Sequence, residues 1–175
     1  MDAVRAIFRL FDFLTATMNR GTGWTNRFRM SRWAAEVERI VRTPPGWDKS
    51  FTAEQIARYG QTDFSKFSTW SIVCEEVLDT TFPCSYFECA RRALRGRGIA
   101  DDEYAELRRM AWLTAGWLNY EMMQWDWHHL DERDMTRAIE RQFKEGWITR
   151  DEHDRRLGVV ARYSVNAGEG TANER

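Results

Sequence analysis

Cysteine, proline and lysine are scarce in this sequence, and no apolar run is long enough to cross a membrane. The three cysteines, Cys74, Cys84 and Cys89, are an odd number in a chain of 175 residues, which argues against a disulfide framework and predicts a reducing, cytoplasmic location. The least charged stretch, residues 110–120, is shorter than the roughly 20 residues of a membrane-spanning helix. Charged residues also interrupt the apolar positions of residues 2–12, so neither a signal peptide nor a membrane partner is expected.

An excess of one charge is also missing, because 26 basic residues balance 27 acidic ones and leave a net charge of -1. This balance implies neither a protein that coats DNA nor a mimic of DNA, and any basic patch must be local. Nearly all of the basic residues are arginines, whose guanidinium groups suit bidentate and stacked contacts better than lysine does. The only lysines are Lys49, Lys66 and Lys144.

Apolar residues recur at helical spacing, and no segment alternates apolar and polar residues as a half-buried strand does. We therefore predict an all-α fold, a compact single-domain bundle of about seven or eight helices. Residues 102–129 are expected to form a long central helix, because they begin with acidic residues and then stay apolar around most of the circumference. Helix starts are predicted at the capping residues Thr52, Asp131 and Thr149.

The domain is predicted to span residues 1–163 and to be followed by a disordered polar tail at 164–175. Residues 3–18 have the pattern of an amphipathic helix, whose apolar face would pack on the rest of the chain or seal a homodimer. The two prolines of TPPG stop the second helix, so residues 43–47 are a candidate hinge after an N-terminal two-helix segment.

Residues 20–33 combine arginine and aromatic side chains without one acidic residue. Such a mixture is typical of hot spots in protein interfaces, and it would also suit phosphate contacts and base stacking in a single-strand binder. Plain structural use is favoured over either by local pairing, since Arg32 has Glu36 one helical turn away. The candidate partner-binding residues of this stretch are Arg20, Trp24, Arg27, Phe28 and Arg29.

A second candidate cluster consists of Arg91, Arg92, Arg95 and Arg97, near the end of a predicted helix. Positive charge at that position complements the helix dipole, which is a sufficient structural reason for it. If this cluster shares a face with residues 20–33, the two together would form a phosphate-binding surface. Sequence alone leaves their relative position open.

Residues 52–73 have the outline of a helix-turn-helix, with a short helix, a turn at Gly60 and a second helix expected to offer Ser65, Lys66, Ser68 and Thr69 outward. The second helix lacks arginine, which favours an ordinary helical hairpin over a DNA reader.

No catalytic residue, cofactor or metal ligand set is predicted. The three histidines and the cysteines lack metal-ligand spacing, and neither a phosphate-binding glycine loop nor a G-x-S-x-G motif is present. Glu121 and His128 share one stripe of the expected central helix and are the best catalytic alternative. They lie two turns apart, about 10 Å along the axis, so they cannot exchange a proton directly.

The sequence therefore favours a non-catalytic adaptor or steric inhibitor that binds a protein or nucleoprotein complex through its arginine- and tryptophan-rich surface. An inhibitor of a host nucleic-acid-handling complex, of the kind that mobile elements carry, fits this description. The alternative is direct DNA or RNA binding through residues 20–33 or the hairpin at 52–73.

Overall fold

The structure, a computed structural model, describes residues 23–78, 81–122 and 129–164, and every regular element in them is helical. The absence of strands from these residues confirms the all-α prediction. Two short 3-10 turns, η1 (Asp48–Ser50) and η2 (Glu75–Val77), and a π-helix, η3 (Trp112–Glu121), accompany the α-helices. These are α2 (Gly23–Val41), α3 (Ala53–Tyr59), α4 (Thr69–Cys74), α5 (Cys84–Gly96), α6 (Asp101–Ala111), α7 (Glu132–Lys144) and α8 (Arg150–Ser164).

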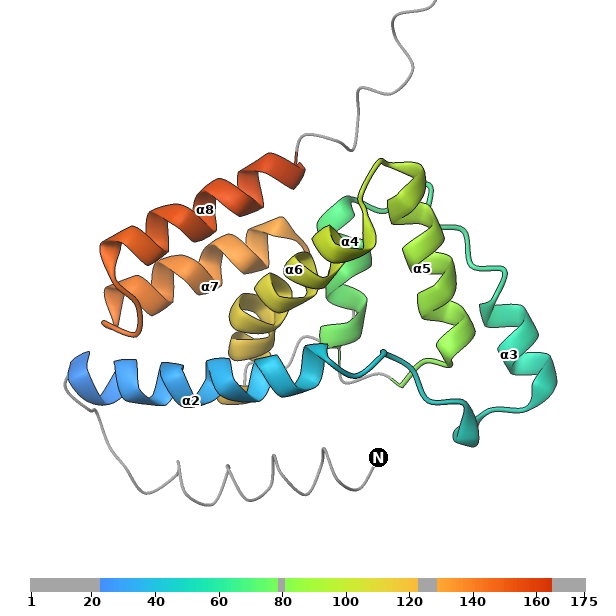
Figure 1. Cartoon of the computed structure of the whole chain (residues 1–175), viewed down its shortest axis with the longest axis horizontal. Coiled ribbons are helices and arrows are strands. Elements are labelled where there is room, and N and C mark those ends of the chain that lie inside the picture. Colours follow the sequence, from blue (N-terminus) through green and yellow to red (C-terminus); the bar gives the residue numbers. More distant parts are fainter. Residues whose placement is uncertain (1–22, 79–80, 123–128, 165–175) are drawn as a thin grey trace, which may run out of the picture.

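The helices pack around α4, α6 and η3 (Figure 1). The hairpin of α7 and α8 lies at one end of the molecule, and α3 packs on α5 at the other end. Helix α2 runs along one side and packs against α6 and η3. The buried residues form one hydrophobic cluster with members from every α-helix except α3, and Trp70 and Trp117 are fully buried within it. No helix among the described residues has both the length and the apolar character needed to span a bilayer.

The long central helix expected at 102–129 is present only in part. The chain is helical from Asp101 to Glu121, but its winding widens from α to π at Trp112. Neither Met122 nor His129 is helical, and residues 123–128 lie outside the described residues.

Three side-chain hydrogen bonds, two of them from other elements, explain why the winding can change there. The indole N–H of Trp33 donates to the Trp112 carbonyl at 3.0 Å, and the Gln142 amide donates to the Leu113 carbonyl at 2.7 Å. The Thr114 hydroxyl donates to the Met110 carbonyl at 2.7 Å. These three carbonyls therefore have side-chain donors that do not depend on α-helical winding. None of them is left without a hydrogen bond where the winding changes from α to π.

The predicted hinge at 43–47 is fastened to the rest of the domain. Arg108 Nη2 donates to the Thr43 carbonyl at 2.8 Å, and the Trp47 amide donates to the Phe82 carbonyl at 3.0 Å. Gly46 adopts a φ of 104° and lies directly against the backbone of Cys84. The loop thus connects α2 to the body of the domain through contacts at both of its ends.

Candidate functional site

Arg29 is used to hold α2 in place. Its Nη2 lies 2.5 Å from Glu121 Oε1, and the Glu121 side chain is only 8% exposed. The guanidinium carbon of Arg29 lies 4.7 Å from the centroid of the Trp147 ring, a cation–π geometry. One turn earlier, Asn26 Nδ2 donates to the Glu145 carbonyl at 2.8 Å. The N-terminal half of α2 is therefore bound to the end of η3 and to the loop after α7.

Arg27 and Phe28 face outward from the same half of α2. Phe28 is 56% exposed and Arg27 is exposed, whereas Met30 and Trp33 lie in the core. Among the described residues, Trp47 is the only other large hydrophobic side chain with an exposed position. Arg20 and the side chain of Trp24 lie outside the described part of the chain. The sequence-predicted surface of residues 20–33 is thus divided between an anchor, Arg29, and an exposed pair, Arg27 and Phe28.

The outward side of α2 is also rich in arginine beyond residue 28. Its exposed arginines are Arg27, Arg32, Arg39 and, just after the helix, Arg42. Arg39 is paired with Glu36, and Glu38 is paired with Arg109 of α6 at 2.5 Å. Both acidic residues of this helix already have arginine partners and Arg32 makes contacts of its own, so Arg27 and Arg42 give the outward side of α2 its positive character within the described residues.

The second predicted cluster is largely occupied by internal contacts. Arg91 and Arg95 both bind the Asp101 carboxylate, at 3.1 and 2.6 Å, and their hydrogen bonds lower the pKa of that group. Arg97 Nη2 donates to the carbonyls of Phe64 and Phe67. Arg92 Nη2 lies 2.8 Å from the sulfur of Cys89. These arginines join α5 to α6 and to the segment before α4.

The two arginine clusters do not share a surface. Figure 1 shows the N-terminal end of α2 at the end of the molecule where the α7–α8 loop lies, whereas α5 stands toward the opposite end, beside α3. The contacts agree, since α2 reaches Glu145 and Trp147, while α5 packs on α3, α4 and α6. The members of the two clusters that the structure describes therefore do not form a combined phosphate-binding surface.

The hairpin at 52–73 differs from the outline of a helix-turn-helix. Thr52 and Gln55 form the predicted capping box of α3. The second helix, α4, begins only at Thr69, because the Ser68 hydroxyl caps it, and all six of its residues are buried. Ser65 and Lys66 lie in the exposed turn before it. The expectation of an outward second helix was wrong, since the aromatic and aliphatic residues of α4 belong to the core.

A polar cluster that the sequence did not reveal lies beside α4. Ser71 Oγ is 3.1 Å from His129 Nε2, and the Tyr86 hydroxyl donates to Glu75 Oε2 at 2.8 Å. A serine–histidine hydrogen bond is one component of a nucleophilic site. However, Ser71 is 3% exposed and lies within a buried helix, so no substrate reaches its hydroxyl in this structure. Ser71 and His129 are 58 positions apart in the sequence, so no local spacing pattern predicts their hydrogen bond.

Burial raises the pKa of the Glu75 carboxyl, against the opposing effects of the Tyr86 hydrogen bond and the charge of His129. A carboxyl whose pKa is raised by folding stabilises the native state only while it is protonated, and this stability is lost as the pH rises through the native pKa. We therefore expect Glu75→Gln to raise the urea midpoint of unfolding near neutral pH. The gain should shrink as the pH falls toward the ordinary glutamate pKa of about 4.3. An unchanged midpoint at neutral pH would contradict this.

Of the two residues in the catalytic alternative, Glu121 and His128, the structure describes the surroundings of Glu121 only. Glu121 is engaged by Arg29 and by further contacts, which is the arrangement of a structural carboxylate. His128 lies outside the described residues. Within those residues, no group of three or more histidine, cysteine or acidic side chains could hold a metal ion.

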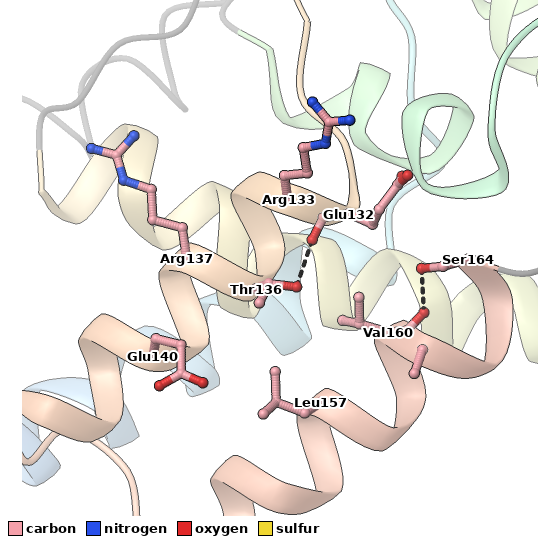
Figure 2. A pocket seen from close by; sticks show the side chains of 9 residues that line it. Glu132, Arg133, Thr136, Arg137, Glu140, Leu157, Val160 and Ser164 are labelled. Carbon is pink, nitrogen blue, oxygen red and sulfur yellow. Dashed lines mark hydrogen bonds between the residues drawn. The ribbon is translucent and has the colours of Figure 1, made fainter.

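A shallow groove of about 550 Å³ lies between α7 and α8. Figure 2 shows Thr136 of α7 and Leu157 and Val160 of α8 around it, with the side chains of Arg133 and Arg137 extending from α7 on the side away from α8. Glu132, Glu140, Ala161 and Ser164 complete the lining. The sequence analysis assigned no role to these residues, because the groove depends on how two helices pair.

Comparison with known protein families, with characterised proteins and with solved structures gives no match for this chain. Function is therefore argued from the geometry of its own surfaces.

Proposed function

We propose that the protein is a non-catalytic adaptor or steric inhibitor that binds a protein or nucleoprotein partner through the outward side of α2, centred on Arg27 and Phe28. The supporting observation is that Phe28 is 56% exposed beside an exposed arginine on a helix whose other side is buried. An aromatic ring flanked by arginine is the composition of interface hot spots. Inhibition of a nucleic-acid-handling complex is one form that such binding would take.

The anchoring of α2 supports a binding role for its outward side. Contacts at Asn26, Arg29, Trp33 and Glu38 fix the helix along its length to the end of α7, to η3 and to α6. A surface held rigid before binding loses less conformational entropy when a partner docks, so more of the contact energy appears as affinity. The helix is thus a preorganised platform for Arg27 and Phe28.

The exposed residues assigned to binding and the residues that anchor α2 are expected to differ in their effect on stability. We expect Arg27→Ala/Phe28→Ala to change the free energy of unfolding by no more than about 0.5 kcal/mol, because both side chains are exposed. Arg29→Ala should lower it by about 1–3 kcal/mol, since the nearly buried Glu121 carboxylate loses its cation. Urea unfolding followed by circular dichroism measures both values. Equal losses in the two variants would contradict this division of roles.

The binding role itself is tested by co-purification with the tagged full-length chain. The partner should be recovered with the wild-type protein and with Arg155→Ala, a control at an exposed position of α8. Recovery should fall at least ten-fold with Arg27→Ala/Phe28→Ala, because hot-spot residues each contribute about 1–2 kcal/mol or more. Recovery that is the same for all three proteins would exclude the α2 surface.

Direct nucleic-acid binding is the second candidate, and the positive outward side of α2 favours it. Fluorescence anisotropy of labelled single-stranded DNA, duplex DNA and RNA tests it at low and moderate salt. Phosphate contacts predict an affinity that falls steeply as salt rises and that weakens in Arg27→Ala and Arg42→Ala. Absence of binding at low salt would leave the protein-partner proposal alone.

A further inference from the structure

The groove between α7 and α8 has an apolar floor that a helix could approach closely. This floor is formed on α8 by Leu157, Val160 and Ala161, of which Ala161 is exposed. A Cβ atom built on Gly158, the exposed residue that follows Leu157, would meet no other atom within 4 Å. The outer side of α8 therefore presents small residues beside a partly buried leucine. This shape leaves room for the backbone of a docked segment.

The charges around the groove are not all neutralised. Glu132 accepts a hydrogen bond from Ser68 at 3.1 Å, and Glu140 lies 3.2 Å from the Nε2 of the buried His153. Arg133 and Arg137 are exposed and one helical turn apart, and neither has an ion pair with a carboxylate in the described part of the chain. The α7 edge of the groove therefore carries two guanidinium groups without a carboxylate partner in the described part of the chain, whereas the two carboxylates of the lining are held by hydrogen bonds to Ser68 and His153.

We propose that this groove binds an acidic amphipathic helix of a partner protein. The apolar side chains of that helix would lie over Leu157, Val160 and Ala161, and two of its carboxylates, one turn apart, would meet Arg133 and Arg137. Charge complementarity argues for this occupant. The apolar floor is unfavourable to a phosphate backbone, whereas it suits the apolar side of an amphipathic helix. The groove lies on α7 and α8, so it is a second surface, independent of α2, as an adaptor requires.

The test uses a labelled synthetic helical peptide with leucines at helical spacing and glutamates one turn apart, and a matched peptide with lysine in place of each glutamate. Fluorescence anisotropy with the full-length protein should show binding of the acidic peptide and at least ten-fold weaker binding of the lysine peptide. Arg133→Glu/Arg137→Glu should weaken the acidic peptide about ten-fold or more and improve binding of the lysine peptide, because both edge charges change sign.

Two further variants locate the peptide. Ala161→Glu places a carboxylate in the groove at an exposed position and should abolish binding of the acidic peptide, whereas Arg155→Glu should leave it unchanged. Arg27→Ala/Phe28→Ala should also bind the peptide normally, so failure of the α2 proposal and failure of this one are distinguishable. The proposal is overturned if the acidic peptide does not bind, or if the acidic and lysine peptides bind alike. It is also overturned if the groove variants bind the acidic peptide as the wild type does, or if single-stranded DNA displaces that peptide.

Discussion

Replacement of Arg108 by alanine is expected to lower the free energy of unfolding by about 3–5 kcal/mol, the cost of leaving a buried charge without its partner. The side chains of Arg108 and Glu76 are 7% and 10% exposed, and their two hydrogen bonds are 2.5 and 2.6 Å long. Burial disfavours the charge of Arg108, but the hydrogen bond and the charge of Glu76 outweigh it and raise the pKa of the guanidinium. Urea unfolding measures the loss.

Arg108 has a second role that adds to this effect. Its Nη1 and Nη2 donate to the carbonyls of Val41 and Thr43, each at 2.8 Å, at the C-terminal end of α2. Carbonyls at a helix end lack partners within the helix, so Arg108→Ala also leaves these acceptors unsatisfied.

Arg109 is the matched control for Arg108. It lies on the same helix, but its side chain is 29% exposed and its partners Glu38 and Glu106 are 43% and 71% exposed. Solvent screens these pairs, so we expect Arg109→Ala to cost no more than about 1 kcal/mol. Losses of similar size in Arg108→Ala and Arg109→Ala would contradict the structural role assigned to Arg108.

Replacement of Gly46 by alanine is expected to lower the free energy of unfolding by about 2–5 kcal/mol. The φ of 104° costs an L-residue about 1–2 kcal/mol, and forcing a methyl group into a filled space adds about 1–3 kcal/mol. The new Cβ atom would lie 2.6 Å from the Cα atom of Cys84 and 2.8 Å from its nitrogen. These are backbone atoms that cannot rotate away, so the loop itself must move.

Gly98 provides the control for Gly46. Its φ is also positive, at 82°, but a Cβ atom there would meet nothing within 4 Å. Gly98→Ala should therefore cost only the conformational part, about 1–2 kcal/mol. If Gly46→Ala were no more destabilising than Gly98→Ala in urea unfolding, residues 43–47 would not be packed against Cys84 as described.

Local signals in the sequence predicted the helical class and several helix starts correctly. The capping box of Thr52 and Gln55 and the cap at Asp131 are present, and Thr149 accepts a hydrogen bond from the Glu152 amide before α8. These features depend on residues within one turn of each other, which is the range in which a sequence specifies its own backbone.

Features that depend on distant residues could not be predicted in this way. The change of winding at Trp112 involves side chains from α2 and α7, and the anchoring of Arg29 involves a glutamate 92 residues away. Arg27 and Arg29 look alike in the sequence, yet one is exposed and the other holds the fold. The groove between α7 and α8 arises only when the two helices pair.

The most direct test of the central claim is site-specific photo-crosslinking in cells, with a photoreactive phenylalanine analogue at position 28 and, as the control, at position 47. We predict a discrete protein adduct from position 28 that survives nuclease treatment, is lost in Arg27→Ala and is absent from position 47, the other exposed large hydrophobic site among the described residues. No adduct from position 28, or the same adducts from both positions, would contradict the claim that the outward side of α2 binds a partner. An adduct that nuclease removes would instead assign this surface to nucleic acid.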